Sequence, residues 1–251
     1  MTPTTIDHSY EVQLPKCPHC GAIKVVLASY YLNGDEVVCW SDLRKYYPNI
    51  NRASYVQRCP SCRKYYFMSD EIVYEPTVYC MVKASWGNLS YSSLRDAFNE
   101  LSPKGKIEKQ MRMMLLHAHN DLYGGCYGTG LKTDALNKER DFFEENVRAL
   151  ILMANIKDPY DRLLKAELYR EIGRFEDAVK ILREPFEYRE HLGLDSIRSL
   201  ILEKAEHRDS NVFIVAGDKN HRREAILVDD KDYLYDEDFA KNYIDKDYLP
   251  F

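Results

Sequence analysis

The fold of the first part of this chain is decided by two segments, Cys17-Pro18-His19-Cys20-Gly21 and Cys59-Pro60-Ser61-Cys62. Each has the form of a zinc knuckle, in which two cysteine thiolates separated by two residues bind one side of a tetrahedral ion. A second pair completes the shell, so the spacing predicts one structural Zn²⁺ ion bound by Cys17, Cys20, Cys59 and Cys62. Four sulfur ligands leave no open coordination position, and we therefore expect the metal to hold a fold and not to catalyse a reaction.

The residue after the second cysteine of each pair lies in a tight turn. The chain there needs a residue that tolerates a positive φ, and Gly21 meets that requirement. Arg63 holds the equivalent position in the second knuckle, in place of the usual glycine. The 38 residues between the pairs, from Gly21 to Arg58, exceed the roughly 15 to 20 residues of compact zinc modules. They are long enough for an inserted hairpin.

Cys-Pro-His-Cys is also the active-site sequence of oxidising thioredoxin-like proteins, whose first thiolate is acidified at a helix N-terminus. Here the first pair is followed by the strand-like run Ile23–Leu27, and the second pair supplies a natural metal partner. Two alternatives stay open: a thiol enzyme that uses Cys17 or Cys126, and four buried thiols without a metal. Cys39 and Cys80 are expected in the core as small apolar residues, although Cys39 could lie near the metal.

The composition is that of a soluble globular protein with one large or two small domains. The chain has 251 residues, of which 45% are hydrophobic and 12% aromatic, enough for a sizeable core. Residues 1–15 lack the features of a secretory signal, and no uncharged apolar stretch is long enough to span a membrane. The two Cys-x-x-Cys pairs favour metal binding in a reducing compartment over disulfides. We therefore expect a cytoplasmic protein without a membrane segment.

The formal net charge of −5 comes from one C-terminal segment. Residues 229–247 contain eight acidic and three basic residues, a difference of −5, so the remaining chain is formally neutral. Residues 1–70 contain eight basic and six acidic residues, and four thiolates with one Zn²⁺ would cancel this balance of +2. No basic field for a phosphate backbone remains, so the charge opposes binding to nucleic acid.

The order of hydrophobic patterns predicts an α+β fold. Short β-rich runs predict antiparallel strands at Ala22–Ser29, Glu36–Trp40, Tyr55–Arg58 and Lys64–Met68. Helical spacing predicts a helix that carries Leu94, Phe98 and Leu101 and ends at Pro103, followed by helices at about 106–122, 138–154, 159–172, 175–186 and 196–207. The predicted domains are a zinc-ribbon-like β domain at 1–90, a helical domain at 91–210, and a C-terminal hairpin with an acidic, tyrosine-rich tail at 211–251.

The C-terminal segment predicts a hairpin and a docking tail. The apolar runs Val212–Val215 and Ala225–Val228 flank the turn Gly217–Asn220, an arrangement typical of a β-hairpin. The acidic tail that follows interleaves aromatic side chains with its carboxylates. We expect this tail to dock on its own chain, with docking on a partner as the alternative.

Residues Leu164–Ala178 look like the middle of a tetratricopeptide repeat, because Gly173 separates two helices that Ala166 and Ala178 allow to pack closely. With the knuckles, this order of features resembles an uncharacterised bacterial protein family. The resembling stretches are the two knuckles, Trp40-Ser41-Asp42, Pro48, residues 111–121 and residues 161–178. The resemblance implies a two-knuckle, zinc-ribbon-like N-terminus and a tetratricopeptide-like helical C-terminal half, and it implies no activity.

The sequence favours a non-enzymatic binding or adaptor protein, in which the zinc module and the helices present a surface to a protein or peptide partner. Both parts have positive evidence, and the sequence contains no catalytic constellation. The first alternative is a nucleic-acid-associated zinc-ribbon protein, because aromatic residues lie close to basic ones along the chain. These residues are Tyr46, Tyr47, Tyr65, Tyr66 and Phe67, near Arg44, Lys45, Arg63 and Lys64. A thiol or redox enzyme is the second alternative.

Overall fold

The structure is a computed structural model, and it describes residues 10–13, 15–24, 26–29, 38–46, 55–68, 74–75, 89–123, 134–185 and 193–217. These residues belong to two compact units. The knuckle unit contains the described residues up to residue 29, residues 55–68, residues 74–75 and residues 89–101. The helical unit contains residues 38–46 and the described residues from 102 to 217.

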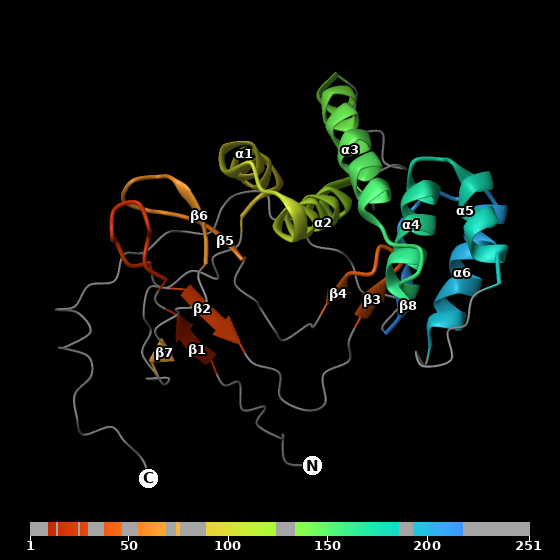
Figure 1. The fold of residues 1–251 in the computed structure, drawn as a ribbon, viewed down its shortest axis with the longest axis horizontal. Helices are drawn as coiled ribbons and strands as arrows, with labels where there is room; N and C mark the ends of the chain where they lie inside the picture. The colour runs from red at the N-terminus through yellow and green to blue at the C-terminus, as the bar shows by residue number, and fades with distance from the viewer. Residues whose placement is uncertain are drawn as a thin grey trace, which may run out of the picture. The chain divides into compact units, whose positions relative to one another are not determined.

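The knuckle unit is built from small antiparallel sheets and one helix in the described part of the chain (Figure 1). One sheet has the order β2-β1-β7, formed by β1 (Tyr10–Gln13), β2 (Val26–Ser29) and β7 (Tyr74–Glu75). A second pairs β5 (Val56–Arg58) with β6 (Tyr65–Phe67), with Gln57 opposite Tyr66. Sheets this short have little core of their own, so a small unit of this kind needs an additional cross-link for stability.

The helix of the knuckle unit is α1 (Tyr91–Leu101). The hydroxyl of Ser90 accepts a hydrogen bond from the N–H of Ser93 at 3.3 Å and caps the N-terminus. Leu94 is buried on the packed face, and the carboxylate of Glu100 accepts a hydrogen bond from the N–H of Tyr65 at 3.2 Å. The helix therefore fixes the second strand of the β5–β6 hairpin.

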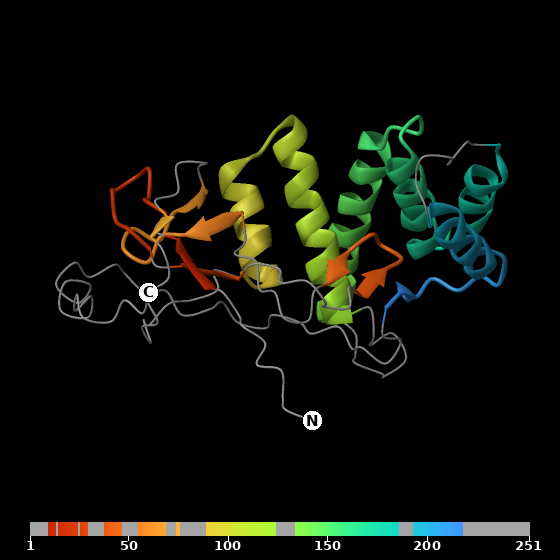
Figure 2. The same cartoon turned by 90° about the horizontal axis from the view of Figure 1, so that it is seen from below.

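The helical unit contains five helices and a three-stranded sheet within its described residues. The helices are α2 (Gly105–Tyr123), α3 (Asp134–Met153), α4 (Pro159–Glu171), α5 (Phe175–Arg183) and α6 (Leu194–Glu206). Each packs against the next along the chain, and Figure 2 shows α2, α3 and α4 side by side. The sheet has the order β4-β3-β8 and is formed by β3 (Val38–Trp40), β4 (Lys45–Tyr46) and β8 (Ile214–Ala216).

Helix α4 lies between two hydrophobic clusters. On one side Leu164 and Leu168 pack with Leu116, Phe143, Val147, Leu150 and Ile151 of α2 and α3. On the other side Leu163 and Ala166 pack with Leu182, Leu194 and Ile201 of α5 and α6. Because both faces of α4 are covered, its charged residues Glu167 and Arg170 are fully buried, and they form an ion pair with an N–O distance of 2.5 Å.

The turns around α4 follow the signals in the sequence. The carboxylate of Asp158 accepts a hydrogen bond from the N–H of Asp161 at 2.9 Å, with Pro159 in the first turn. Gly173 separates α4 from α5 with a φ of 76°, a left-handed conformation that glycine adopts without strain. The helix boundaries expected here, 159–172 and 175–186, agree with the structure to within a few residues.

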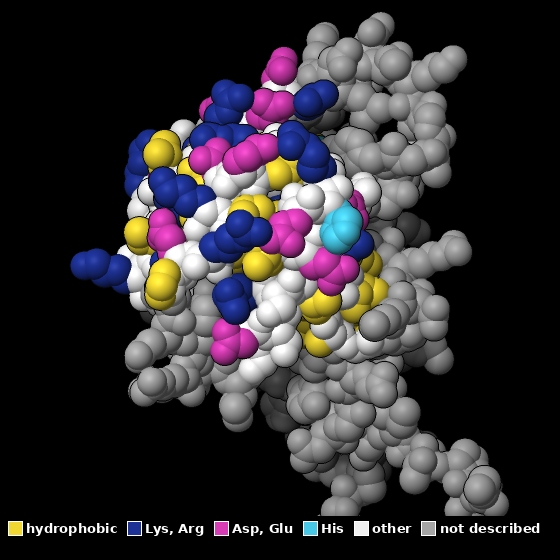
Figure 3. Space-filling view, turned by 90° about the vertical axis from the view of Figure 1, so that its right-hand side faces the viewer, with side chains coloured by type: hydrophobic (Ala, Val, Ile, Leu, Met, Phe, Trp, Pro, Cys, Tyr) yellow, Lys and Arg dark blue, Asp and Glu magenta, His cyan; other side chains and the backbone are white. Residues whose placement is uncertain are grey.

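The surface of the helical unit carries both signs of charge. Figure 3 shows Lys and Arg side chains interspersed with Asp and Glu on the face that it presents. Around α5 and α6 these side chains form ion pairs, namely Arg174 with Asp177, Arg183 with Glu206 and Arg208 with Glu176. These paired charges leave the described α5–α6 surface without a continuous basic field.

The mixed α+β class is confirmed, with small antiparallel sheets and six helices in the described residues. The strand predicted at 36–40 exists as β3, but its assignment to the N-terminal module is wrong. It belongs to the helical unit, where it pairs with β8. The compact units also divide at other positions than the predicted ranges 1–90, 91–210 and 211–251. Of the hairpin predicted at the C-terminus, the first run, Val212–Val215, overlaps β8, which pairs with β3. The second run, Ala225–Val228, and the acidic tail lie outside the described residues, so the hairpin stays a prediction.

No helix among the residues that the structure describes combines the length and the apolar character needed to cross a membrane.

Candidate metal centre

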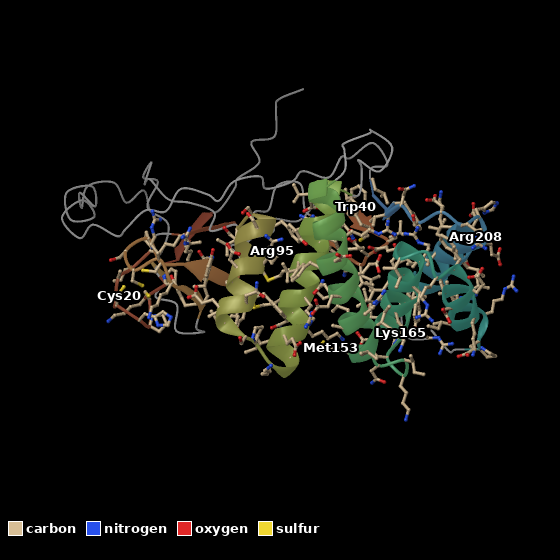
Figure 4. All side chains as sticks on the ribbon, turned by 90° about the horizontal axis from the view of Figure 1, so that it is seen from above. Cys20, Trp40, Arg95, Met153, Lys165 and Arg208 are labelled. Carbon is tan, nitrogen blue, oxygen red and sulfur yellow. The ribbon has the colours of Figure 1, made fainter. Side chains whose placement is uncertain are left out.

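Four sulfur atoms from the two knuckles meet in one cluster, which Figure 4 shows beside the label of Cys20. The Sγ atoms of Cys17, Cys20, Cys59 and Cys62 all lie within 4.8 Å of one another. The Sγ atoms of Cys17 and Cys62 are 3.7 Å apart, and those of Cys20 and Cys59 are 3.6 Å apart. A tetrahedral ion with metal–sulfur bonds of about 2.3 Å places its sulfur ligands about 3.8 Å apart. The four cysteines can therefore hold a metal ion.

The first knuckle owes its shape to two backbone hydrogen bonds. The N–H of Gly21 donates to the carbonyl of Cys17 at 2.9 Å, and the N–H of Cys17 donates to the carbonyl of Ala22 at 2.8 Å. Gly21 has a φ of 77°, which confirms the expected need for a residue that tolerates the left-handed region. The tight turn brings Cys20 back toward Cys17, so both thiols point into one site.

The second knuckle repeats this turn with different residues. The N–H of Arg63 donates to the carbonyl of Cys59 at 2.9 Å, and the N–H of Cys59 donates to the carbonyl of Lys64 at 2.9 Å. Arg63 has a φ of 64°, so a residue with a side chain occupies the left-handed position. The N–H of Cys62 also points at the Sγ of Cys59 at 3.4 Å, a contact that stabilises a thiolate.

In each knuckle the first cysteine is more deeply buried than the second. Cys17 and Cys59 are buried, and Tyr66 packs against both. Cys62 is half-buried and Cys20 is exposed. One edge of the cluster therefore faces solvent, whereas its other side faces the core of the hairpin.

Without a metal, the environment favours the protonated thiol at the two buried cysteines and eases ionisation at Cys20. Burial raises the pKa of Cys59 to about 12, and burial also raises the pKa of Cys17. The backbone N–H of Ala22 lowers the pKa of Cys20 to about 7. A buried thiolate is unfavourable without a counter-charge, so a divalent cation that binds here would replace the protons of Cys17 and Cys59 and supply that charge.

The chain around the first knuckle holds it against the second. The ring nitrogen Nε2 of His19 lies 3.3 Å from the carbonyl oxygen of Tyr65, so the two share a hydrogen bond. Lys16 and Ile23 form an antiparallel bridge across the first knuckle. The structure therefore places β-structure after Cys20, in agreement with the strand-like run in the sequence, and the pair does not begin a helix.

The two described segments that contain the four cysteines are basic in sequence, although Lys24 is fully buried and the carboxylate of Glu100 in α1 accepts a hydrogen bond from the N–H of Tyr65. Residues 15–24 and 55–68 contain five basic residues and no acidic ones: Lys16, Lys24, Arg58, Arg63 and Lys64. Four thiolates with a divalent ion carry −2, so these segments would keep a local charge of +3, the difference between five and two. The balance of +2 over residues 1–70 is smaller because that range also contains six acidic and three basic residues outside these two segments.

The other cysteines do not join the cluster in the described part of the chain. Cys39 is half-buried in β3, in the helical unit. Cys39 is therefore only partly buried, whereas the sequence predicted a core position. It lies in a different unit from the four clustered cysteines. Cys80 and Cys126 lie outside the described residues.

The helical unit contains a group of polar residues that the sequence did not indicate, in which Asp42 and Asn120 are buried and Glu171 is half-buried. The side-chain nitrogen Nδ2 of Asn120 donates to Asp42 at 3.0 Å and to Glu171 at 3.1 Å. Burial raises the pKa of Glu171 well above its ordinary value, and the charges of Glu167 and Asp42 add to this effect. The partners are too far apart in the chain for any local pattern to reveal them.

Comparisons of the chain with protein families, with curated proteins and with solved structures gave no match.

Proposed function

We propose that this chain is a non-enzymatic binding protein, whose knuckle unit is held together by one structural zinc ion and whose helical unit binds a protein or peptide. The observation that carries the proposal is the closed set of four sulfur atoms, with pairs 3.6 and 3.7 Å apart. A shell of four thiolates leaves no position for a substrate or a reactive water. The metal would therefore act as a cross-link for a unit with small sheets.

Zinc is the metal that this ligand set favours. Tetrahedral sites with four sulfur ligands are typical of Zn²⁺ or of iron–sulfur centres, and two Cys-x-x-Cys knuckles are the usual arrangement of a structural zinc site. Structural zinc supplies an apparent binding free energy of about 10 kcal/mol or more to small modules. Free cysteines that bind a metal also favour a reducing compartment, and we therefore propose a cytoplasmic location.

A thiol enzyme that attacks through Cys17 is disfavoured by the state of that residue. The attacking thiol of such an enzyme is accessible and has a lowered pKa. Cys17 is 1% exposed, and burial raises its pKa. The chain after Cys20 forms a bridge and then β2, so no helix N-terminus stabilises a thiolate there.

The binding surface that we propose lies in the helical unit. Helices α4 and α5 support a tetratricopeptide-like pair, because Ala166 and Ala178 are fully buried and Gly173 forms the turn between the helices. Close to this pair, Leu152 is 85% exposed, and Ile156 and Tyr160 are also exposed. Three large apolar side chains between residues 152 and 160 offer a contact surface for a partner with an apolar face.

The test of the zinc centre is a metal analysis of the full chain and of two matched cysteine variants. We expect one zinc ion per chain in the wild type and in Cys39→Ser, whose cysteine lies outside the cluster. We expect no retained zinc in Cys59→Ser, together with lost protection of the β5–β6 amides in hydrogen exchange. A wild-type chain without metal, or a Cys59→Ser variant that keeps it, would contradict the proposal.

The test of the partner surface compares two exposed leucines on different helices. Full-length chains with Leu152→Asp or Leu200→Asp are used as bait in an affinity capture with the wild type as reference. We expect Leu152→Asp to lose a partner that the wild type and Leu200→Asp retain, with the thermal stability of all three unchanged. If both variants capture the same proteins in equal amounts, the surface around Leu152 does not bind the partner and this part of the proposal is wrong.

A nucleic-acid ligand is the second candidate, and the local charge of the knuckles favours it. Lys16, Arg63 and Lys64 are exposed in the two cysteine segments and Arg58 is half-buried, whereas Lys24 is fully buried. Tyr55 is exposed, and its ring centroid lies 5.6 Å from that of Phe67. Basic and aromatic side chains together bind single strands, with an affinity that falls as salt rises. This candidate predicts salt-dependent binding of single-stranded RNA or DNA that Lys64→Glu weakens and Lys180→Glu leaves unchanged. An absent or salt-insensitive signal would remove it.

A further inference from the structure

The four cysteines of the proposed metal centre are shielded from solvent to different degrees. Cys17 and Cys59 are 1% and 0% exposed, and Tyr66 packs against both. Cys62 is half-buried, whereas Cys20 is exposed. A reagent that arrives from solvent therefore meets the centre first at Cys20.

The turn that carries Cys20 is open to solvent and fixed in place. Its neighbours Pro18, His19 and Gly21 are exposed as well. The ring nitrogen Nε2 of His19 lies 3.3 Å from the carbonyl oxygen of Tyr65, a contact that ties the turn to β6. The fold therefore holds Cys20 at the centre and leaves this residue accessible.

The exposed sulfur of one knuckle is in contact with a buried sulfur of the other. The Sγ atom of Cys20 lies 3.6 Å from that of Cys59, and the Sγ atom of Cys17 lies 3.7 Å from that of Cys62. The N–H of Cys62 also points at the Sγ of Cys59 at 3.4 Å. In redox-sensitive proteins an accessible thiol commonly meets the oxidant, and a second thiol beside it resolves the product. Cys20 and Cys59 have this arrangement.

We propose that Cys20 is an oxidation site, at which hydrogen peroxide converts Cys20 and Cys59 into a disulfide and releases the metal ion. The inference rests on the proposed zinc centre, because binding of Zn²⁺ keeps the sulfur atoms as thiolates. The thiolate is the nucleophilic form of cysteine and the form that peroxides oxidise. Hydrogen peroxide is small and uncharged, so it reaches one sulfur at the exposed edge without opening the buried side.

The reaction balances with one molecule of hydrogen peroxide. The thiolate of Cys20 attacks one oxygen of the peroxide, so that an S–O bond forms, the O–O bond breaks and hydroxide leaves. The thiolate of Cys59 then attacks the sulfenic sulfur of Cys20, so that the S–S bond forms, the S–O bond breaks and a second hydroxide leaves. Two protons from solvent convert both hydroxides to water. The sulfur atoms together lose two electrons, and the peroxide oxygens gain both.

The disulfide removes the metal ion but keeps the two knuckles linked. Only Cys17 and Cys62 remain as ligands, and two thiolates do not complete the tetrahedral shell of a structural site. The new bond joins the same two segments that the ion joined, and it brings the sulfur atoms from 3.6 Å to about 2.05 Å. Reduction of the disulfide returns all four thiols, so the loss of the metal is reversible.

The first test measures the release of Zn²⁺ from the zinc-loaded full chain by hydrogen peroxide. It uses the wild type and a variant without the other cysteines, Cys39→Ser with Cys80→Ser and Cys126→Ser, and a chromogenic chelator reports the ion. For this variant we expect about two thiols lost per ion released, and dithiothreitol with Zn²⁺ should restore about one ion per chain. Zinc that stays bound while free N-acetylcysteine is fully oxidised would overturn the inference and leave the metal centre standing.

The second test identifies the oxidised cysteines by mass spectrometry. Trypsin cuts after Lys and Arg and separates the knuckles into the peptides 17–24 and 59–63, so a disulfide between knuckles joins two peptides.

We expect the first disulfide to join Cys20 to Cys59, and the sulfenic-acid reagent dimedone to label Cys20 before the other three cysteines of the cluster. Cys62 is the matched control, because it is the second cysteine of the other knuckle and is half-buried. A first disulfide within one knuckle or between Cys17 and Cys62, or a first label at Cys62, would overturn the inference. If the triple variant does not fold, the same mapping of the wild type decides. A wild-type chain that binds no Zn²⁺ would overturn both proposals.

Discussion

Arg63 repeats in the second knuckle the left-handed backbone that Gly21 has in the first, with φ values of 64° and 77°. Both residues donate their N–H to the carbonyl of the first cysteine of their pair at 2.9 Å. The cysteine positions and the backbone hydrogen bonds therefore set the geometry of the turn, and arginine adopts the same backbone conformation as glycine. A side chain at this position carries a conformational cost that glycine does not.

Exchanging the residue types at these two positions should change stability in opposite directions. We expect Arg63→Gly to stabilise the metal-loaded knuckle unit by about 0.5–1 kcal/mol, since the relief of strain exceeds the entropy cost of glycine. Gly21→Ala should destabilise by about 1 kcal/mol, and this cost is strain alone, because the added Cβ lies 3.6 Å from Cε of Lys16, an ordinary contact.

Guanidinium unfolding of the zinc-loaded chains measures both effects. The two variants are controls for each other, because each changes one knuckle and leaves the ligands intact. A loss of stability in Arg63→Gly would show that the arginine side chain contributes more than its backbone conformation costs.

The buried pair of Glu167 and Arg170 leads to a second prediction. Both side chains are fully buried, and Arg170 also donates to the backbone oxygen of Asp209 and lies over the ring of Phe213. Arg170→Met leaves an uncompensated carboxylate and should cost about 3–5 kcal/mol. The double variant Arg170→Met with Glu167→Met should recover a large part of that loss, because neither charge of the buried pair remains.

Thermal unfolding of the single and double variants measures this difference. Arg183→Met is the control, since Arg183 pairs with Glu206 at the surface with both side chains exposed, and its loss should cost less than about 1 kcal/mol. A double variant as unstable as Arg170→Met would mean that the contacts of Arg170 to Asp209 and Phe213 dominate, and not the lost ion pair.

The features that could be predicted from the sequence are those set by neighbours in the chain. The spacing of Cys17 and Cys20, and of Cys59 and Cys62, predicted a cluster, and the four sulfurs do meet. Helix periodicity and the break at Gly173 located the helices to within a few residues. In both cases the interaction that decides the structure joins residues a few positions apart, so a local pattern contains the information.

The features that could not be predicted depend on residues far apart. Ser41 bonds to Phe213 across 172 positions, and Asp42 bonds to Asn120 across 78. The local pattern assigns β3 to the N-terminal module because its neighbours in sequence are strands, yet its partners lie in the helical unit. A run of three residues in a strand carries no mark of the strand it pairs with, so long-range pairing overrode the local prediction.

A pH-dependent stability should follow from Glu171. Burial raises its pKa well above the ordinary value of 4.5, with added effects of Glu167 and Asp42, whereas Arg170 and Asn120 oppose the rise. Its folded state then holds a proton that the unfolded state releases above about pH 4.5. The stabilisation is therefore complete below that pH and is lost as pH rises through the folded pKa.

The Glu171→Gln variant separates this effect from others. The introduced glutamine side chain cannot ionise and still offers an oxygen to Asn120, so the variant should gain stability relative to the wild type as pH rises above about 4.5. The measurement is the free energy of unfolding of both chains between about pH 5 and 9. Parallel curves for the two chains would show that Glu171 does not carry the proton.

His119 should act in the opposite sense at lower pH. Its ring is 3% exposed and stacks on Phe143 with centroids 3.9 Å apart, and burial lowers its pKa from 6.5 to about 4. Between these values the unfolded chain binds a proton that the folded chain does not. The stabilisation is therefore complete above pH 6.5 and is lost as pH falls toward 4, by about 3 kcal/mol in total.

Comparison with His119→Gln isolates the histidine from Glu171, whose contribution has the opposite slope in part of this range. We expect the variant to lose less stability than the wild type between pH 6.5 and 4, whatever its stability at neutral pH. His207→Gln is the matched control, because His207 is an exposed histidine at the end of α6. Urea unfolding at several pH values measures the slopes. Equal slopes in wild type and His119→Gln would mean that the folded helical unit accepts a proton at His119, and hence that its packing on Phe143 opens at mildly acidic pH.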